Sequence, residues 1–289
     1  MFSAKLWKSD AVLRLILSVI ICVFTGSVLV AALQNRAGFR FYLVLVPALV
    51  CLGLTLYLLR MAWRIENVLR RLALVLVCFY GGLVLGAWAA KIAGPTTPSI
   101  GQMIISALSL QGAALLLVLP FLREHETSWS DAFGFRWNWP RALLLGVIVA
   151  CIFLPIGWLL QEGSARLMVR LNYHPEPQQV VQTLETSRAW LGRVVFGLIT
   201  VLLVPPAEET FFRGILYPWI KQAGYPRLAL WGTSLLFATI HTNLPSFVPL
   251  FVLALALTIL YERTGNLLAP IAGHAVFNAA NLIRLYLLG

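Results

Sequence analysis

The chain contains very few charged residues. Asp, Glu, Lys and Arg together make up 11% of its 289 residues, whereas 60% are hydrophobic. The hydrophobic residues form successive stretches of roughly 17 to 25 residues, which is the length that a helix needs to cross a bilayer. This composition indicates that lipid, and not water, surrounds most of the chain. We therefore predict an all-α, polytopic membrane protein with about eight to nine membrane helices.

The apolar stretches define nine predicted helices. They are Ala11–Leu33, Phe41–Leu59, Leu72–Ala90, Gly101–Leu122, Arg141–Leu160, Ala189–Ile220, Arg227–His241, Ser246–Tyr261 and Leu267–Leu288. The first stretch is longer than the apolar segment of a signal peptide and lacks a small-x-small cleavage site at its end. We expect it to be a retained signal anchor.

Cysteine is scarce as well. The four cysteines are Cys22, Cys51, Cys78 and Cys151, and each lies inside an apolar stretch. No C-x-x-C spacing occurs, which excludes a disulfide framework and a thiolate metal site. We predict that these cysteines are small core residues.

Acidic residues are outnumbered by basic ones, 11 to 22, and the net charge is +11. The basic residues are clustered in short loops, as membrane orientation requires, so we expect no nucleic-acid partner. Lys5 and Lys8 precede the first helix, and the second connection is richer in arginine than the first. This distribution predicts a cytoplasmic amino terminus, in the plasma membrane if the cell is prokaryotic.

Ionisable residues inside the helices occur late in the chain. The first five helices contain almost none beyond Arg14, whereas the last four contain two glutamates, two histidines and an arginine. We therefore divide the chain into residues 1–188, with no assigned function, and residues 189–289, a catalytic helix bundle. Two long connections, 123–140 and 161–188, separate the late helices from the early ones. The second begins with an amphipathic segment and would form an interfacial helix or a cover over the site.

The first polar motif follows two prolines, Pro205 and Pro206, inside a long apolar helix. An ionisable residue within a membrane helix indicates a functional site, because burying its charge is costly. Glu209 and Arg213 are four residues apart and share a helix face, so they can pair. Glu208 projects about 100° away from that face, so the two glutamates must have different roles. The alternative is that all three residues mark a helix end that emerges into the cytoplasm.

The two histidine motifs read F-x-x-x-H, from Phe237 to His241, and H-x-x-x-N, from His274 to Asn278. Taken alone, His241 could be a helix C-cap that the helix dipole favours, and His274 with Asn278 could be an interhelical hydrogen-bonded pair. Taken together with a carboxylate, these groups can activate water and stabilise an oxyanion. Counting residues from the helix starts places His241 roughly 10 Å deeper than His274, although one site needs them level.

The three motifs resemble those of the CPBP intramembrane proteases, the family that includes the CAAX prenyl endopeptidase. The matching residues are Glu208, Glu209, Arg213, Phe237, His241, His274 and Asn278. The resemblance extends over Ala189–Arg284, roughly a third of the chain, and Gly214 after the arginine also fits it. The first five helices show no such resemblance.

The resemblance implies roles for the catalytic residues. Glu208 would be the general base that activates water together with His241. His274 and Asn278 would form the oxyanion side of the site. The second glutamate of the motif and its arginine would orient the helix.

The predicted reaction is hydrolysis of a membrane-associated peptide or protein substrate that enters from the lipid bilayer. Two other functions fit the sequence. One is a non-catalytic immunity or scaffold protein of the same family, and the other is a proton-coupled transporter. A transporter would be supported by inverted repeats or broken helices, and no internal symmetry is visible.

Zinc is the cofactor to consider, with Glu208, His241 and His274 as its ligands if a metal is bound. The chain lacks the H-E-x-x-H motif, in which two histidines share one helix face with the base. Asn278 is a poor zinc ligand but a good donor to a carbonyl oxygen. We therefore predict a metal-independent enzyme with no cofactor.

Overall fold

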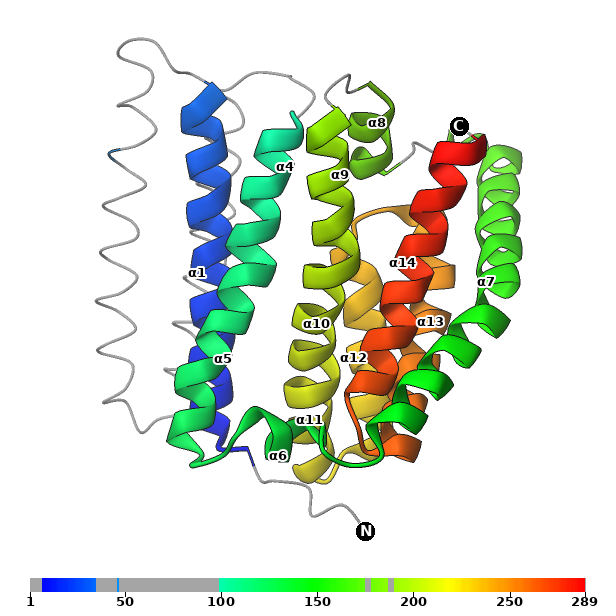
Figure 1. Ribbon diagram of the computed structural model, residues 1–289. Helices are drawn as coiled ribbons and strands as arrows, with labels where there is room; N and C mark the ends of the chain where they lie inside the picture. The colour runs from blue at the N-terminus through cyan, green and yellow to red at the C-terminus, as the bar shows by residue number, and fades with distance from the viewer. Residues whose placement is uncertain (1–6, 35–45, 47–98, 175–177, 187–189, 289) are drawn as a thin grey trace. The chain divides into compact units, whose positions relative to one another are not determined.

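The computed structural model describes residues 7–34, 46, 99–174, 178–186 and 190–288 (Figure 1). All regular elements in these ranges are helices, which confirms the predicted all-α class. The predicted helices Phe41–Leu59 and Leu72–Ala90 lie outside the described residues. The chain divides into two compact units, Asp10–Phe121 and a second formed by Met1–Ser9 with Leu122–Gly289.

The first unit contains α1 (Ser9–Gln34), α4 (Ile100–Ala107), the π-helical turn η1 (Leu108–Gly112) and most of α5 (Ala113–Glu124). These helices match the predicted stretches Ala11–Leu33 and Gly101–Leu122 closely. A Cβ atom on Gly26 of α1 would lie 2.3 Å from the Cβ of Ser109, so the two helices touch where their residues are small.

The second unit holds all the motif residues, and one continuous helix carries the first motif. Residues Trp190–Gln222 form this helix, which we call the bulged helix because two π-helical turns interrupt it. Its segments are α9 (Trp190–Leu198), η2 (Ile199–Leu203), α10 (Val204–Glu209), η3 (Thr210–Leu216) and α11 (Tyr217–Gln222). Its bounds agree with the predicted helix Ala189–Ile220.

Prolines explain where the two π turns lie. The N–H of Val204 bonds to the carbonyl of Ile199, five residues earlier, directly before Pro205. The N–H of Tyr217 bonds in the same way to Phe212, directly before Pro218. Proline cannot donate a backbone hydrogen bond, so each π turn widens the helix where the next donor is missing. The glutamate pair lies between the two turns.

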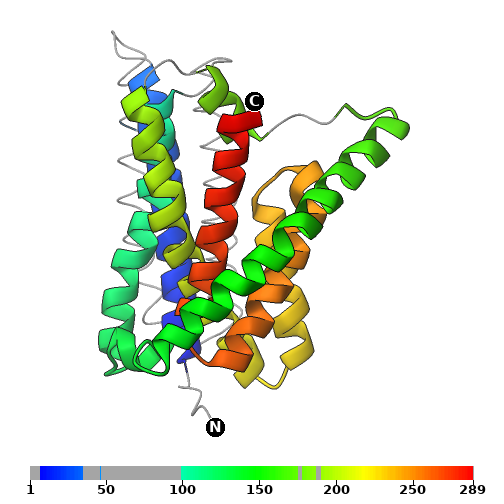
Figure 2. The ribbon, with the colours of Figure 1, turned by 45° about the vertical axis from the view of Figure 1, so that its right-hand side comes forward.

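Three further helices pack around α7 (Trp139–Arg170) or around one another: α12 (Pro226–Ile240), α13 (Leu244–Thr264) and α14 (Leu268–Leu288). Helix α7 runs along both α13 and α14 (Figure 2). A Cβ on Gly146 of α7 would lie 2.3 Å from the carbonyl oxygen of Ala269, and one on Gly273 would lie 3.1 Å from the carbonyl oxygen of Gly146. Small residues thus let the two backbones touch beside His274, a packing mode common between membrane helices.

Helix α7 corrects one prediction. It continues ten residues beyond the predicted end at Leu160, so the amphipathic opening of the predicted connection 161–188 is its last three turns. The rest of that connection contains the short helix α8 (Gln179–Thr186). The connection 123–140 contains another short helix, α6 (Trp129–Phe133).

Five helices of the described chain are long and apolar enough to cross a membrane: Ser9–Val28, Ile100–Glu124, Trp139–Arg170, Trp190–Gln222 and Leu244–Thr264. The predicted count of eight to nine spans is therefore not confirmed. Helix α12 has only 15 residues, about 22 Å of rise, which is shorter than the hydrocarbon layer. Helix α14 has 21 residues but is not among these five spans.

The burial of two cysteines differs from the prediction that they are core residues. Cys151 is exposed on α7, so it is not a core residue, and Cys22 is only partly buried. Both are free thiols. Cys51 and Cys78 lie outside the described residues.

Candidate active site

The ion pair predicted from the spacing of Glu209 and Arg213 is present. Their side chains are 0% and 1% exposed, and Arg213 Nη1 lies 2.9 Å from Glu209 Oε1. The alternative of a helix end that emerges into water is therefore wrong, since both charges are fully inside the bundle. A buried pair of this kind requires further partners for its remaining donors and acceptors.

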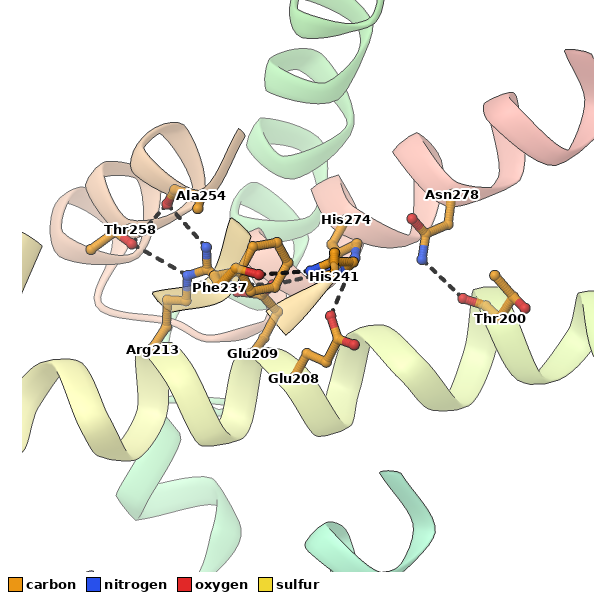
Figure 3. A network of polar contacts seen from close by, with 10 residues as sticks. All are labelled: Thr200, Glu208, Glu209, Arg213, Phe237, His241, Ala254, Thr258, His274 and Asn278. Atoms are coloured by element: carbon orange, nitrogen blue, oxygen red, sulfur yellow. Dashed lines mark hydrogen bonds and ion pairs between the residues drawn. The ribbon is translucent and has the colours of Figure 1, made fainter. Parts of the chain in front are cut away.

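Helix α13 supplies those partners to the arginine. Arg213 Nη2 donates to the carbonyl of Ala254 at 3.0 Å, and its Nε donates to the hydroxyl of Thr258 at 3.3 Å. The guanidinium carbon also lies 4.7 Å from the centre of the Phe237 ring, within the range of a cation–π contact. Arg213 thus joins the bulged helix to α12 and α13 (Figure 3).

Glu209 also holds His274. The Nδ1 atom of His274 lies 2.8 Å from Glu209 Oε1, the same oxygen that accepts from Arg213. An ionised carboxylate can only accept, so we assign the hydrogen to Nδ1. This leaves Nε2 of His274 directed away from Glu209, as in catalytic groups whose imidazole is oriented by a carboxylate.

Glu208 has a different environment from its neighbour, as the helix geometry predicts. Its Oε2 atom is buried and has no hydrogen-bond partner among the described residues. That oxygen faces Nε2 of His274 at 3.9 Å, which is too long for a hydrogen bond (Figure 3). Oε2 of Glu209 is also buried without a partner among the described residues. The two glutamates differ in that Oε1 of Glu209 bonds both Arg213 and His274, whereas Glu208 faces the other nitrogen of His274.

His241 is the C-cap residue of α12, where the alternative interpretation places it. Its Nδ1 lies 2.6 Å from the carbonyl of Phe237, which can only accept, so we assign a hydrogen to Nδ1. The capping contact therefore orients the imidazole but does not use its second nitrogen. The two interpretations of His241 are compatible.

Phe237 is the residue of the motif whose role the sequence does not reveal. Its ring is fully buried, and its centre lies 4.8 Å from the ring of His241 and 5.8 Å from that of His274. The phenyl ring thus contacts both imidazoles as well as the Arg213 guanidinium. The two histidines, which come from different helices, therefore contact the same ring.

Asn278 contacts the bulged helix at its first π turn. Its Nδ2 donates to the carbonyl of Thr200 at 3.0 Å. That carbonyl lacks backbone donors, because the N–H of Val204 bonds to Ile199 and the next residue is proline. Asn278 is therefore an interhelical contact, as one alternative proposed, and its second N–H is still available. The prolines at 205 and 206 are the sequence signal for this contact.

A metal centre would need several His, Cys, Asp or Glu side chains close together. Among the residues that the structure describes, no group of three or more His, Cys, Asp or Glu side chains is arranged to hold a metal ion. The arrangement of donor side chains does not measure whether activity needs a metal, so metal independence stays a prediction.

The fold and the site together define a helical membrane protein with a buried Glu–Arg–His cluster. Residues 190–280 match the family described as Type II CAAX prenyl endopeptidase Rce1-like, which confirms the resemblance for this segment. The match supports a CAAX-type intramembrane protease fold for roughly a third of the chain.

A curated relative is also similar to this region. It is an uncharacterized protein, YpbD, of Bacillus subtilis, and it is 36% identical over 97 residues. The alignment covers 32% of this chain and 46% of the relative, so the chain spans less than half of that protein. No solved structure matches the chain.

Proposed function

We propose that this protein is a CAAX-type intramembrane endopeptidase that hydrolyses a membrane-associated peptide or protein with an activated water. The observation that carries the proposal is the unpartnered, buried oxygen of Glu208 opposite Nε2 of His274. A buried carboxylate oxygen without a donor is costly, so a bound water is the simplest partner for it.

Charge balance supports different roles for the two histidines. Glu209 neutralises Arg213, so the charge of Glu208 is balanced if His274 is protonated. A protonated His274 donates from Nε2, and Asn278 donates from its free N–H, to the oxyanion that forms on the substrate carbonyl. His241 accepts a hydrogen bond from the water at Nε2 and takes no proton from it.

The proposed reaction then uses Glu208 as base and acid. Glu208 removes a proton from the water, and the hydroxide forms a bond to the carbonyl carbon. The protonated Glu208 returns that proton to the amide nitrogen as the carbon–nitrogen bond breaks. Glu209 touches no reacting atom in this scheme and serves to orient His274.

The test compares membranes from cells with the wild-type protein, with Glu208→Gln and without the protein, by a survey of new peptide termini. We expect a set of cleavages that only the wild type produces. A purified assay would add two synthetic peptides of one sequence, ending in C-a-a-X, with and without a farnesyl group on the cysteine. If Glu208→Gln gives the same termini as the wild type, the protein acts as a non-catalytic scaffold or immunity protein instead.

A further inference from the structure

The segment just before α1 lies against the bulged helix at the carboxyl end of the first motif. The N–H of Trp7 donates to Gln222 Oε1 at 3.0 Å, and Gln222 Nε2 donates back to the Trp7 carbonyl at 2.7 Å. Trp219 Nε1 donates to the hydroxyl of Ser9 at 3.1 Å. These reciprocal contacts attach residues 7–9 to α11.

The indole of Trp7 reaches further along the same helix. Its Nε1 donates to the carbonyl of Gly214 at 3.0 Å, in a buried hydrogen bond between residues 207 positions apart. In an α-helix this carbonyl would accept the N–H of residue 218, which is proline. The side chain of Trp7 therefore takes the place of a missing backbone donor, as Asn278 does for Thr200 at the first π turn.

Gly214 is also covered by an aromatic ring. A Cβ atom at this position would lie 2.7 Å from Cε1 of Phe133, so the ring rests directly on the glycine. Trp7 is buried, and its ring lies 6.4 Å from that of Phe133 and 5.0 Å from that of His125. The carbonyl of Phe133 accepts the N–H of Leu267, which directly precedes α14. The turn that follows Arg213 is thus held from outside the helix on two sides.

We infer that Trp7 is a positioning residue for the active site. It acts through the Gly214 carbonyl on the π turn Thr210–Leu216, and so on the placement of Arg213 and the glutamates before it. The inference rests on the proposed function only in regarding those glutamates as catalytic.

The experiment removes the N–H donor and keeps an aromatic side chain. Trp7→Phe lacks the indole N–H, and Trp137→Phe is the matched control because Trp137 is exposed. Hydrogen–deuterium exchange of the purified protein is measured by mass spectrometry over residues 210–217. We expect exchange there to be about tenfold faster in Trp7→Phe, the order that loss of one buried hydrogen bond allows, and unchanged in the control.

A second substitution tests the mechanism directly. Pro218→Ala restores a backbone N–H four residues after Gly214, so in the Trp7→Phe background it should return exchange to within about threefold of the wild type. In the peptide assay, Trp7→Phe should lower kcat about tenfold with KM nearly constant, and the double variant should recover kcat.

The inference is overturned if Trp7→Phe exchanges like the wild type over 210–217, or if Pro218→Ala fails to reverse the change. Exchange does not require turnover. A wild-type protein without peptidase activity would thus refute the proposed function and leave the exchange result to decide the role of Trp7.

Discussion

Two adjacent glutamates on one helix have opposite situations, and this difference organises the site at the scale of residues. Glu209 shares its Oε1 between Arg213 and His274, whereas Oε2 of Glu208 faces Nε2 of His274 at 3.9 Å. Each glutamate has one buried oxygen, Oε2, without a partner among the described residues. Helical periodicity separates their directions, so neighbours in sequence take one structural and one chemical role.

Glu208→Gln should abolish cleavage and leave the melting temperature unchanged, because the amide is the same size but cannot take a proton. Glu162→Gln is the matched control, since Glu162 is exposed on α7. Both variants are compared in the peptide assay and by thermal unfolding in detergent. Normal turnover by Glu208→Gln would refute the mechanism.

Glu209→Ala or Arg213→Ala should lower stability as well as activity. Each substitution leaves one buried charge without its partner, at a cost of about 3 to 5 kcal/mol. The exposed pair Glu162 and Arg166 has the same i, i+4 spacing, and its alanine variants should change stability by less than about 1 kcal/mol. Equal melting temperatures for the two sets would contradict the buried network.

At the scale of elements, the site depends on close contact between helices that carry no catalytic group and those that do. Helix α7 has no motif residue, yet its Gly146 touches the backbone of α14 one turn before His274. The functional division predicted at residue 189 and the structural division at residue 122 are thus different boundaries. Helix α7 belongs to the same compact unit as the site because it packs against the helices of the site, although it supplies no catalytic group.

Gly146→Ala should therefore reduce both stability and activity. Its Cβ would meet the Ala269 carbonyl oxygen at 2.3 Å, and a backbone atom cannot move away without shifting α14. Gly163→Ala in the same helix is the control, because nothing lies within 4 Å of its added Cβ. We expect the control to be neutral or slightly stabilising, since alanine favours helix by up to about 1 kcal/mol. Identical thermal unfolding of the two variants would argue against the contact.

At the scale of the whole molecule, the chemistry is expected to need only the chain itself. The buried cluster contains two acidic and two basic groups, and a glutamate assisted by imidazole can activate water without a metal. We propose that the substrate reaches the site laterally from the bilayer, since the bulged helix that carries the glutamates is long and apolar enough to cross it.

The purified protein should accordingly cleave its substrate without bound metal. Elemental analysis is combined with assays before and after treatment with a chelator, and we expect no stoichiometric zinc and no loss of activity. One zinc per chain, with activity lost on removal and regained on return, would overturn this prediction and favour Glu208, His241 and His274 as ligands.

The sequence by itself determined the features that depend on local periodicity, namely the positions of the long helices and the pairing of residues within one helix. The apolar lengths predicted the long helices of the described chain to within a few residues, apart from the longer α7, but not the short α6. The i, i+4 spacing predicted the pairing of Glu209 with Arg213. These features depend on contacts within one helix, which spacing specifies.

Contacts between helices were decided only by the tertiary structure. His274 bonds Glu209 and faces Glu208. Asn278 and Trp7 each donate to a carbonyl that a proline leaves without a backbone donor. The ring of Phe237 contacts both histidines. Spacing along one helix cannot specify such partners. They depend on where small residues let backbones approach and on how far each helix slides along its neighbour.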